Sequence, residues 1–212
     1  MRGVSEITAG LRQRKKERTR EAIVDAALAL FAERGFEGTT VADIAAAADI
    51  APRTFFGYFP AKEDVVFHDF DAVHEGLRAR LRDREPGETA IDAMRAWIAG
   101  IVAQADFKDA RERCRHQIIR DTPSLQDRDR ALLGHFEALL AEAVAEDLGV
   151  EPTALRPRIV SAAATAALGA LEAVYHEDDA REPEDPLAVV DEAVVFLRGG
   201  IAALSEKPPP PA

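Results

Sequence analysis

The sequence has a single cysteine, Cys114, in 212 residues, so no intramolecular disulfide can form. One thiol without a partner indicates a reducing compartment, and we expect a cytoplasmic protein. No run of about 18 apolar residues occurs, because charged side chains interrupt every hydrophobic stretch, and we therefore expect no membrane span. The first twenty residues also lack the apolar core of a secretory signal. With 47% hydrophobic residues, the chain can still bury a sizeable core without a metal or a disulfide.

Patterns for metal binding and catalysis are lacking as well. His68 and His74 are six residues apart, and His116 and His135 fall on different predicted helices, so no histidine pair has the spacing of four residues that binds a metal on one helix face. Cys114 and His116 are two apart and would point to different faces of a helix, which makes a poor nucleophile and base pair. We therefore predict no metal, no cofactor and no enzymatic activity.

Charge is distributed unevenly along the chain, whose net charge is −11. Residues 1–20 have seven basic and two acidic side chains, a net charge of +5, whereas residues 63–212 have seventeen basic and thirty acidic ones, a net charge of −13. A basic end on an acidic body suits an anionic partner at that end. Charge alone does not distinguish this from a merely solvated basic tail.

The hydrophobic periodicity is helical throughout, and no segment alternates convincingly at a period of two. We predict an all-α fold of about nine helices, at residues 14–34, 41–48, 52–58, 62–83, 88–105, 107–120, 124–148, 153–177 and 186–205. In the first, Ile23, Ala27, Leu30 and Phe31 form one apolar stripe, and Gly35 ends the helix. Residues 1–13 are predicted to be a flexible basic tail, and 207–212 a disordered proline-rich tail.

Residues 40–59 have the features of a helix-turn-helix. Thr40 and Asp43 form a capping box at the start of one short helix, and Pro52 has the fixed φ that suits the first position of the next. Small alanines at 45 and 48 allow a close crossing, and the predicted core between the helices is Ile44, Ile50, Phe55 and Phe59. The second helix would then expose Arg53, Thr54, Gly57 and Tyr58, which is unusual for a helix that binds nothing.

The run RTREAIVDAALALFAERGFEGTTVADIAAAADIAPRTFFGYFPAKEDVV resembles the N-terminal DNA-binding domain of the TetR family of bacterial regulators. The resemblance is far more specific than a lone helix-turn-helix pattern, because several short motifs follow in the same order. These motifs are LF, then G(F/Y), then TTV-DIA, then T-aromatic-aromatic-x-YF--K. Two residues depart from it. Asp49 replaces the usual turn glycine, where it must adopt a left-handed conformation with modest strain. Ala51 replaces the usual Ser or Thr cap, at a cost of about 1 kcal/mol that Pro52 partly offsets.

The resemblance implies a DNA-binding domain at 14–62 with distinct roles for its residues. Thr40, Tyr58 and Lys62 would hold backbone phosphates. Arg53 would read guanine, Pro52 or the Thr54 methyl would pack on thymine, and the groove-facing set would be Pro52, Arg53, Thr54, Phe56 and Gly57. Phe55 and Phe59 are expected in the core, Phe56 either in the core or at DNA, and Tyr58 at a phosphate in preference to mere packing.

For residues 63–206 the resemblance implies a helical effector-binding and dimerisation bundle. Its last two helices would form the dimer contact, with Val190, Val194, Leu197, Ile201 and Leu204 as the apolar stripe of the second, although both could be ordinary core. The pocket candidates, each also a candidate for core, are Trp97, Ile101, Phe107, Cys114, Phe136, Leu140 and Tyr175. The segment CRHQIIRDTPSLQDRDRALLGHFEALLAEAVAEDLG resembles the C-terminal domain of some actinobacterial regulators of the family, including mycofactocin-linked ones, and hints at a largely apolar effector.

The predicted function is therefore a dimeric, sequence-specific transcription regulator that binds double-stranded DNA at a palindromic operator. Repression relieved by a small molecule is the default for such a protein, and activation stays open. The alternative is a helical ligand-binding protein or enzyme that has lost DNA binding, and the intact set Arg53, Thr54, Tyr58 and Lys62 argues against it.

Overall fold

The computed structural model describes residues 2–103, 110–175 and 186–205, and all of its regular structure in those ranges is helical. By their contacts the residues divide into two units. Unit 1 comprises Met1–Asp69 and Lys108–Asp127, and unit 2 comprises Phe70–Phe107 and Arg128–Ala212. In the described residues every helix is too short or too polar to cross a membrane. The predicted all-α class is confirmed, and the described residues form ten helices where about nine were expected for the chain.

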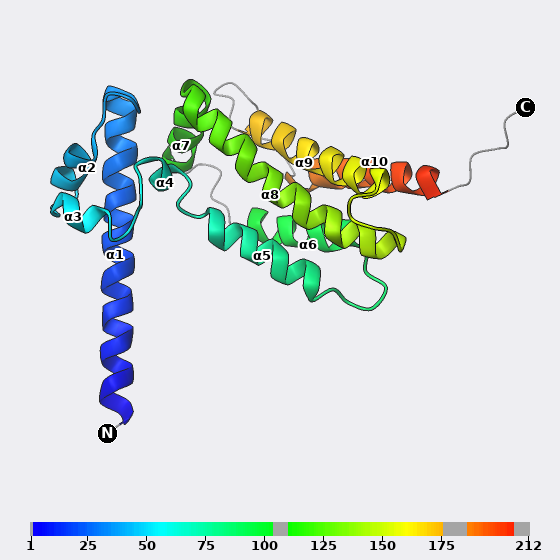
Figure 1. Ribbon diagram of the computed structural model, residues 1–212, viewed down its shortest axis with the longest axis horizontal. Coiled ribbons are helices and arrows are strands. Elements are labelled where there is room, and N and C mark those ends of the chain that lie inside the picture. The colour runs from blue at the N-terminus through cyan, green and yellow to red at the C-terminus, as the bar shows by residue number, and fades with distance from the viewer. Residues whose placement is uncertain (1, 104–109, 176–185, 206–212) are drawn as a thin grey trace, which may run out of the picture. The chain divides into compact units, whose positions relative to one another are not determined.

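Unit 1 is built around one long helix, α1 (Arg2–Arg34). The short helices α2 (Val41–Ala47) and α3 (Pro52–Phe55) lie together beside it, and α7 (Ala110–Asp121) packs against it as well (Figure 1). The apolar stripe of α1 is buried as predicted, with Ile23, Ala27 and Phe31 almost inaccessible to solvent. Gly35 ends the helix with a φ of +76°. The helix begins at Arg2, not at residue 14. Adding a residue to an existing helix costs much less free energy than starting a new helix, so the preceding residues extend α1.

The core of unit 1 includes side chains from residues 63–206, the predicted effector domain. Ile118 and Ile119 of α7, and Leu125 at the start of α8 (Pro123–Leu148), are buried in the same cluster as Ile23 and Phe55. The expected domain boundary at 62/63 thus differs from the observed division, which falls at 69/70 and adds 108–127 to unit 1. The division differs because the apolar side chains of α7 complete the hydrophobic core of unit 1, which the short helices beside α1 leave open on their own.

The predicted helix over 62–83 is interrupted. It consists of α4 (Glu63–Val66) and α5 (Phe70–Arg82), with Phe67 between them at φ −103° and ψ 34°. Neither glycine nor proline is present at the break. Side chains from elsewhere satisfy the carbonyl groups that it releases, because Arg20 donates to the carbonyl of His68 and Arg115 donates to that of Val66 at 3.4 Å.

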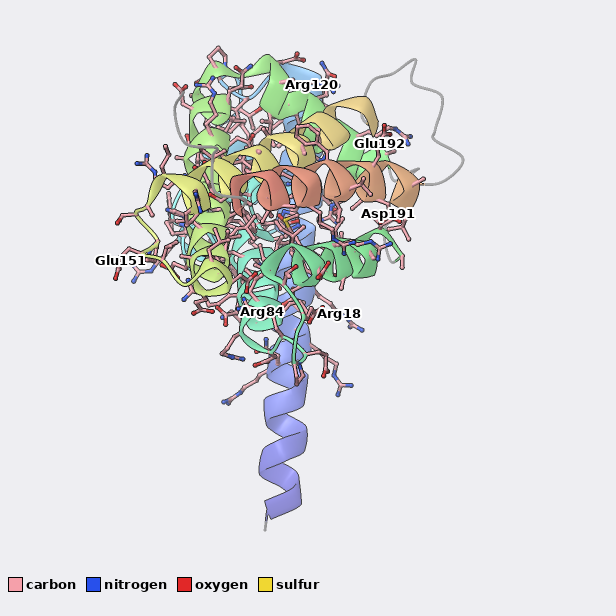
Figure 2. The ribbon with its side chains drawn as sticks, turned by 90° about the vertical axis from the view of Figure 1, so that its right-hand side faces the viewer. Arg18, Arg84, Arg120, Glu151, Asp191 and Glu192 are labelled. Atoms are coloured by element: carbon pink, nitrogen blue, oxygen red, sulfur yellow. The ribbon has the colours of Figure 1, made fainter. Side chains whose placement is uncertain are left out.

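Unit 2 is a bundle of α5, α6 (Ala90–Val102), α9 (Leu155–Tyr175), α10 (Pro186–Ser205) and the rest of α8. Its core contains Leu77 and Leu81 of α5, Met94 of α6, and Leu140 and Val144 of α8. Helix α6 starts with a second capping box, from Thr89 to Asp92. Figure 2 shows α9 and α10 running alongside each other, and labels Asp191 and Glu192 on α10.

Two ion pairs join α6 to α10. The guanidinium of Arg95 forms a bidentate pair with the carboxylate of Asp191, with one of its two hydrogen bonds at 2.7 Å, and Arg198 pairs with Asp92. Together with the burial of Val190, Val194 and Leu197, these contacts fix one face of α10 against its own unit. Of the two interpretations open for this stripe, burial supports the intramolecular core for Val190, Val194 and Leu197, and the side chain of Leu204 lies outside the described residues.

Candidate nucleic-acid interface

The start of α2 is formed by the predicted capping box. The amide of Asp43 donates to the Thr40 hydroxyl oxygen at 3.2 Å, and the amide of Thr40 donates to the Asp43 carboxylate at 2.9 Å. The Thr40 hydroxyl also donates its proton to that carboxylate. These hydrogen bonds hold the pKa of Asp43 below its usual range. Thr40, predicted to hold a phosphate, is exposed, but its hydroxyl proton is already engaged within the cap.

The turn after α2 has the left-handed residue that was predicted. Asp49 has a φ of +53°, and it is the one non-glycine residue with positive φ in the described part of the chain. Its amide donates to the carbonyl of Ala46 at 3.2 Å, and the next amide, of Ile50, donates to that of Ala45 at 2.9 Å. This pair of bonds is the Schellman motif, which satisfies the carbonyl groups at a helix end. The turn therefore survives the replacement of glycine.

Helix α3 begins at Pro52 and lacks a side-chain cap, since Ala51 precedes it. Its α-helical part ends at Phe55, three residues before the expected end at 58. Helical hydrogen bonds nevertheless continue: the amide of Gly57 donates to Thr54 at 3.0 Å, and the amides of Tyr58 and Phe59 donate to Phe55 at 2.8 and 3.0 Å. Phe55 and Phe59 are buried in the core of unit 1, as predicted.

The predicted reading residues share one exposed surface. Pro52, Arg53, Thr54, Phe56 and Gly57 are all exposed. Phe56 is 56% exposed, with its ring at the edge of Phe55, and so it does not belong to the core. Arg53 forms no ion pair or side-chain hydrogen bond within the described residues, which leaves its donors available. A Cβ at position 57 would lie 3.2 Å from the Thr54 carbonyl oxygen, so larger residues fit there only if the backbone shifts.

Lys62 lies in a more constrained position than the sequence indicated. Its ammonium donates to the carbonyl of Phe36 at 2.8 Å and to that of Thr39 at 3.1 Å. It also lies 4.2 Å from the centroid of the Phe36 ring, a cation–π contact. An ammonium has three N–H groups, so one is left for a phosphate. Lys62 thus joins the start of α4 to the loop between α1 and α2.

That loop contains two residues that sequence reasoning missed. Thr39 is buried, and its hydroxyl lies within hydrogen-bond distance of the carbonyl oxygens of Gly35, at 2.9 Å, and Leu30, at 3.3 Å. A Cβ on Gly38 would lie 2.5 Å from the Arg34 carbonyl oxygen, so only glycine fits there without a shift. The signal available was the GTT triplet itself, which resembles any polar loop until the positions of the carbonyl groups are known.

Arg20 is a further missed residue. Its guanidinium lies 4.9 Å from the centroid of the Phe59 ring and donates to the carbonyl of His68. Tyr58, next to Phe59, is half-buried against the core of unit 1. Arg20 therefore holds the segment that follows α3 against α1, although a basic side chain near the N-terminus suggested only a charged surface.

The seven pocket candidates do not form one group. Trp97, Phe136 and Leu140 belong to the core region of unit 2, where the rings of Trp97 and Phe136 lie 6.4 Å apart. Ile101 is 42% exposed. Phe107, and the side chain of Tyr175, lie outside the described residues. Phe136 also contacts Phe70 and His74, neither of which was among the candidates.

Cys114 belongs to unit 1 instead, because α7 packs on α1. Its thiol lies 3.9 Å from the Leu28 carbonyl oxygen, and burial raises the pKa of this thiol. It borders an open groove of about 540 Å³ between α7 and the end of α1, where Phe31, Phe36 and Ile118 also lie. Cys114 is therefore not part of an effector pocket in the core of unit 2.

Both parts of the chain match family models. Residues 23–68 match the model for bacterial regulatory proteins of the tetR family, and residues 88–202 match that of the MftR C-terminal domain. The chain is 33% identical over 160 residues to the HTH-type transcriptional regulator TcmR of Streptomyces glaucescens, an alignment that covers 72% of this chain and 71% of that protein.

Two solved structures support the fold over nearly the full length. The crystal structure of NalD, described as the secondary repressor of the MexAB-OprM multidrug efflux pump in Pseudomonas aeruginosa, is 26% identical, with a TM-score of 0.58 over 87% of this chain and 97% of NalD. The SmeT–triclosan complex is 25% identical, with a TM-score of 0.59 over 84% of this chain and 90% of SmeT.

Proposed function

The chain belongs to the TetR family of bacterial regulatory proteins, and on that premise we propose that it is a repressor that binds a palindromic DNA operator as a homodimer and leaves it when a small molecule binds. The observation that carries this is the exposed surface of α3, where Arg53 lies between Pro52 and Thr54 without a side-chain partner in the described residues, next to α2, which is capped at both ends. Such a protein acts on DNA in the bacterial cytoplasm and has no catalytic role.

Arg53 is the residue we propose for direct readout. Its guanidinium matches the O6/N7 edge of guanine, and a bidentate contact of this kind is worth about 1–3 kcal/mol of discrimination. Pro52 and the methyl group of Thr54 are suited to thymine methyl groups. Phe56, more than half exposed, adds apolar contact in the groove or at its edge.

The proposed phosphate contacts are Thr40, Tyr58 and Lys62, which fix the position of the domain without reading sequence. Lys62 has one free N–H for this purpose, and Tyr58 is half-buried at the end of the α3 segment. At Thr40 the donors for a phosphate would be the first-turn amides of α2 that follow it, since the amide and the hydroxyl of Thr40 both donate to the Asp43 carboxylate.

A dimer is required because one helix-turn-helix reads one half of a palindrome. The surface that supports it is the exposed side of α9 and α10. On α9, exposed apolar residues recur with helical spacing at Leu155, Ile159, Ala162 and Ala166. On α10, Val195 and Phe196 are 67% and 75% exposed, which is unusual for large apolar side chains next to each other. We propose this face, and not the buried stripe at Val190 and Val194, as the dimer contact.

We propose an effector site in unit 2 near Trp97 and Phe136, whose partly buried rings suit a largely apolar molecule with an aromatic or otherwise planar part. The SmeT–triclosan complex supports a small, apolar aromatic ligand for a protein of this fold.

Selection of duplexes from a random pool by the full-length protein tests the proposal. We expect recovery of a palindromic consensus in which the centres of the two half-sites are separated by one turn of the DNA helix, about 34–36 Å. Arg53→Ala should relax preference at one or two base pairs of each half-site. Failure to enrich any sequence at low salt would favour the alternative of a helical ligand-binding protein or enzyme that has lost DNA binding.

A further inference from the structure

Residues 12–18 of α1 are densely basic, and their basic side chains have no partner within the described residues. Arg12, Arg14, Lys15, Lys16 and Arg18 are all exposed, and none forms a side-chain hydrogen bond or an ion pair within the part of the chain that the structure describes. Arg18 projects from α1 in Figure 2. Like charges three or four residues apart destabilise a helix, by about 0.2–0.5 kcal/mol per pair. The cluster therefore contributes nothing to the fold that would explain its presence.

Four of these side chains lie on two opposite faces of the helix, and Lys15 lies between the two faces. Arg12, Lys16 and Arg20 are spaced by four residues and share one face. On this face the guanidinium of Arg20 lies against Phe59, at the end of the α3 segment. We call Arg12 and Lys16 the basic row. It continues the side of α1 on which the DNA-reading segment packs.

The other pair lies on the side of α7. Arg14, Arg18 and Asp25 share one face, because Arg18 is four residues after Arg14 and Asp25 is seven residues after Arg18. The carboxylate of Asp25 lies 3.2 Å from the guanidinium of Arg111 of α7. A shift of two residues rotates a helix position by about 200°, so Arg14 and Arg18 point away from the basic row.

We propose that the basic row binds phosphates of the DNA that flanks each half-site, outside the base pairs read by α3. This inference rests on the proposed function and extends it to a second, sequence-independent contact. Along the helix axis Lys16 lies about 6 Å and Arg12 about 12 Å beyond Arg20, so the row reaches well past the α3 segment.

Duplex DNA is the occupant that the charges favour. Phosphate groups are the dense anionic array for which free Arg and Lys donors are suited, and binding breaks no existing ion pair here. Because residues 63–212 have a net charge of −13, the rest of the chain repels DNA, and attraction is confined to this end of unit 1.

The test compares two double variants of the full-length protein, R12Q/K16Q and R14Q/R18Q. Each removes two positive charges at the same spacing from the same helix, and glutamine preserves helix propensity. Affinity for the selected operator, with about ten flanking base pairs on each side, is measured by fluorescence anisotropy over a series of KCl concentrations. Helix content and the midpoint of thermal unfolding confirm that both variants fold as the wild type does.

For R12Q/K16Q we expect the slope of log affinity against log salt to decrease in magnitude by about 1.8 per half-site, because each lost phosphate contact contributes about 0.9. Affinity near 0.1 M salt should fall at least about tenfold. R14Q/R18Q should change affinity by less than about threefold, and removal of the flanking base pairs should abolish the difference between wild type and R12Q/K16Q.

Equal slopes and equal affinity losses for the two variants would overturn the proposal, since the charges would then act only as a diffuse field. A footprint unchanged by R12Q/K16Q at its outer edges would count against it as well. If the wild type itself binds no DNA, the proposed function fails first, and that outcome is distinct from a wild type that binds with no contribution from the basic row.

Discussion

Asp49 and Gly149 occupy the same position in two copies of one helix-ending motif, the first after α2 and the second after α8. Their φ angles are +53° and +63°. In both copies this residue's amide donates to the carbonyl three residues back, at 3.2 Å, and the next amide donates to the carbonyl five residues before it, at 2.9 Å after α2 and 3.0 Å after α8. The motif is thus the same, but only the second copy has the residue type that adopts this conformation without strain.

Substitutions at these two positions should have opposite effects. Asp49→Gly should raise the free energy of unfolding by about 0.5–1 kcal/mol, because glycine relieves the strain of a left-handed residue. Gly149→Ala should lower it by about 1 kcal/mol, and since a Cβ there would meet no atom within 4 Å, the loss would come from the backbone alone. Urea unfolding measures both. A less stable Asp49→Gly protein would mean that the aspartate side chain contributes more than its strain costs.

The helix boundaries that the sequence predicted well are those with a local cause. Thr40 with Asp43, Gly35 and Pro52 each determine a boundary through the backbone of their own neighbours, and the structure confirms all of them. The break at Phe67 has no such cause. It depends on Arg20 and Arg115, which are distant in sequence and reach the released carbonyl groups only after folding.

The same distinction explains the dimer prediction. Periodicity shows that Val190, Val194 and Leu197 share one face of α10, but it does not show which surface covers that face. In the structure it is the helix's own unit, and Val195 and Phe196 are left outside. For the reading surface, by contrast, the exposure of Arg53 and Thr54 and the burial of Phe55 and Phe59 were predicted, because a short helix between two turns has only one face to bury.

Lys62→Met should destabilise the protein even without DNA. The change removes two hydrogen bonds from a charged donor and a cation–π contact, and we expect the free energy of unfolding to fall by roughly 1–3 kcal/mol. Lys16→Met is the matched control, because that ammonium is exposed and has no partner within the described residues. Equal stabilities of the two variants in urea would show that Lys62 serves DNA alone.

Phe196→Glu should weaken self-association and, with it, affinity for the palindrome. A carboxylate on a face that becomes buried leaves an unpaired charge in the interface, so we expect a shift from dimer to monomer in analytical ultracentrifugation at micromolar concentration. Ile101→Glu, which also places a carboxylate at an exposed apolar position but not on α9 or α10, should leave the dimer intact. A dimeric Phe196→Glu protein would place the interface elsewhere.

His68 should make stability depend on pH. Burial is the main cause that lowers the pKa of His68. The negative charges of Asp69 and Glu112 raise this pKa and the positive charges of Arg115 and Arg111 lower it, and the net direction is down. The unfolded chain therefore binds the proton first as pH falls below about 6.5, so the free energy of unfolding decreases from there down to the folded pKa.

Replacement of this side chain tests that dependence. His68→Gln removes the titrating group, and the stability difference between pH 8 and pH 5.5 should become smaller than in the wild type. The measurement is chemical unfolding at both pH values. Parallel losses of stability in the two proteins would assign the pH dependence to other groups.

The position of the Lys62 ammonium has a consequence for how DNA would be recognised. A free lysine side chain loses rotamer entropy worth up to about 2 kcal/mol when a contact immobilises it. Here folding has already immobilised the side chain, through the carbonyl groups of Phe36 and Thr39, so little of that loss is left for the binding step. A charge held this firmly cannot follow a displaced phosphate. It would therefore favour duplexes whose backbone passes through that one position, which is a selection for DNA shape made by a residue that touches no base.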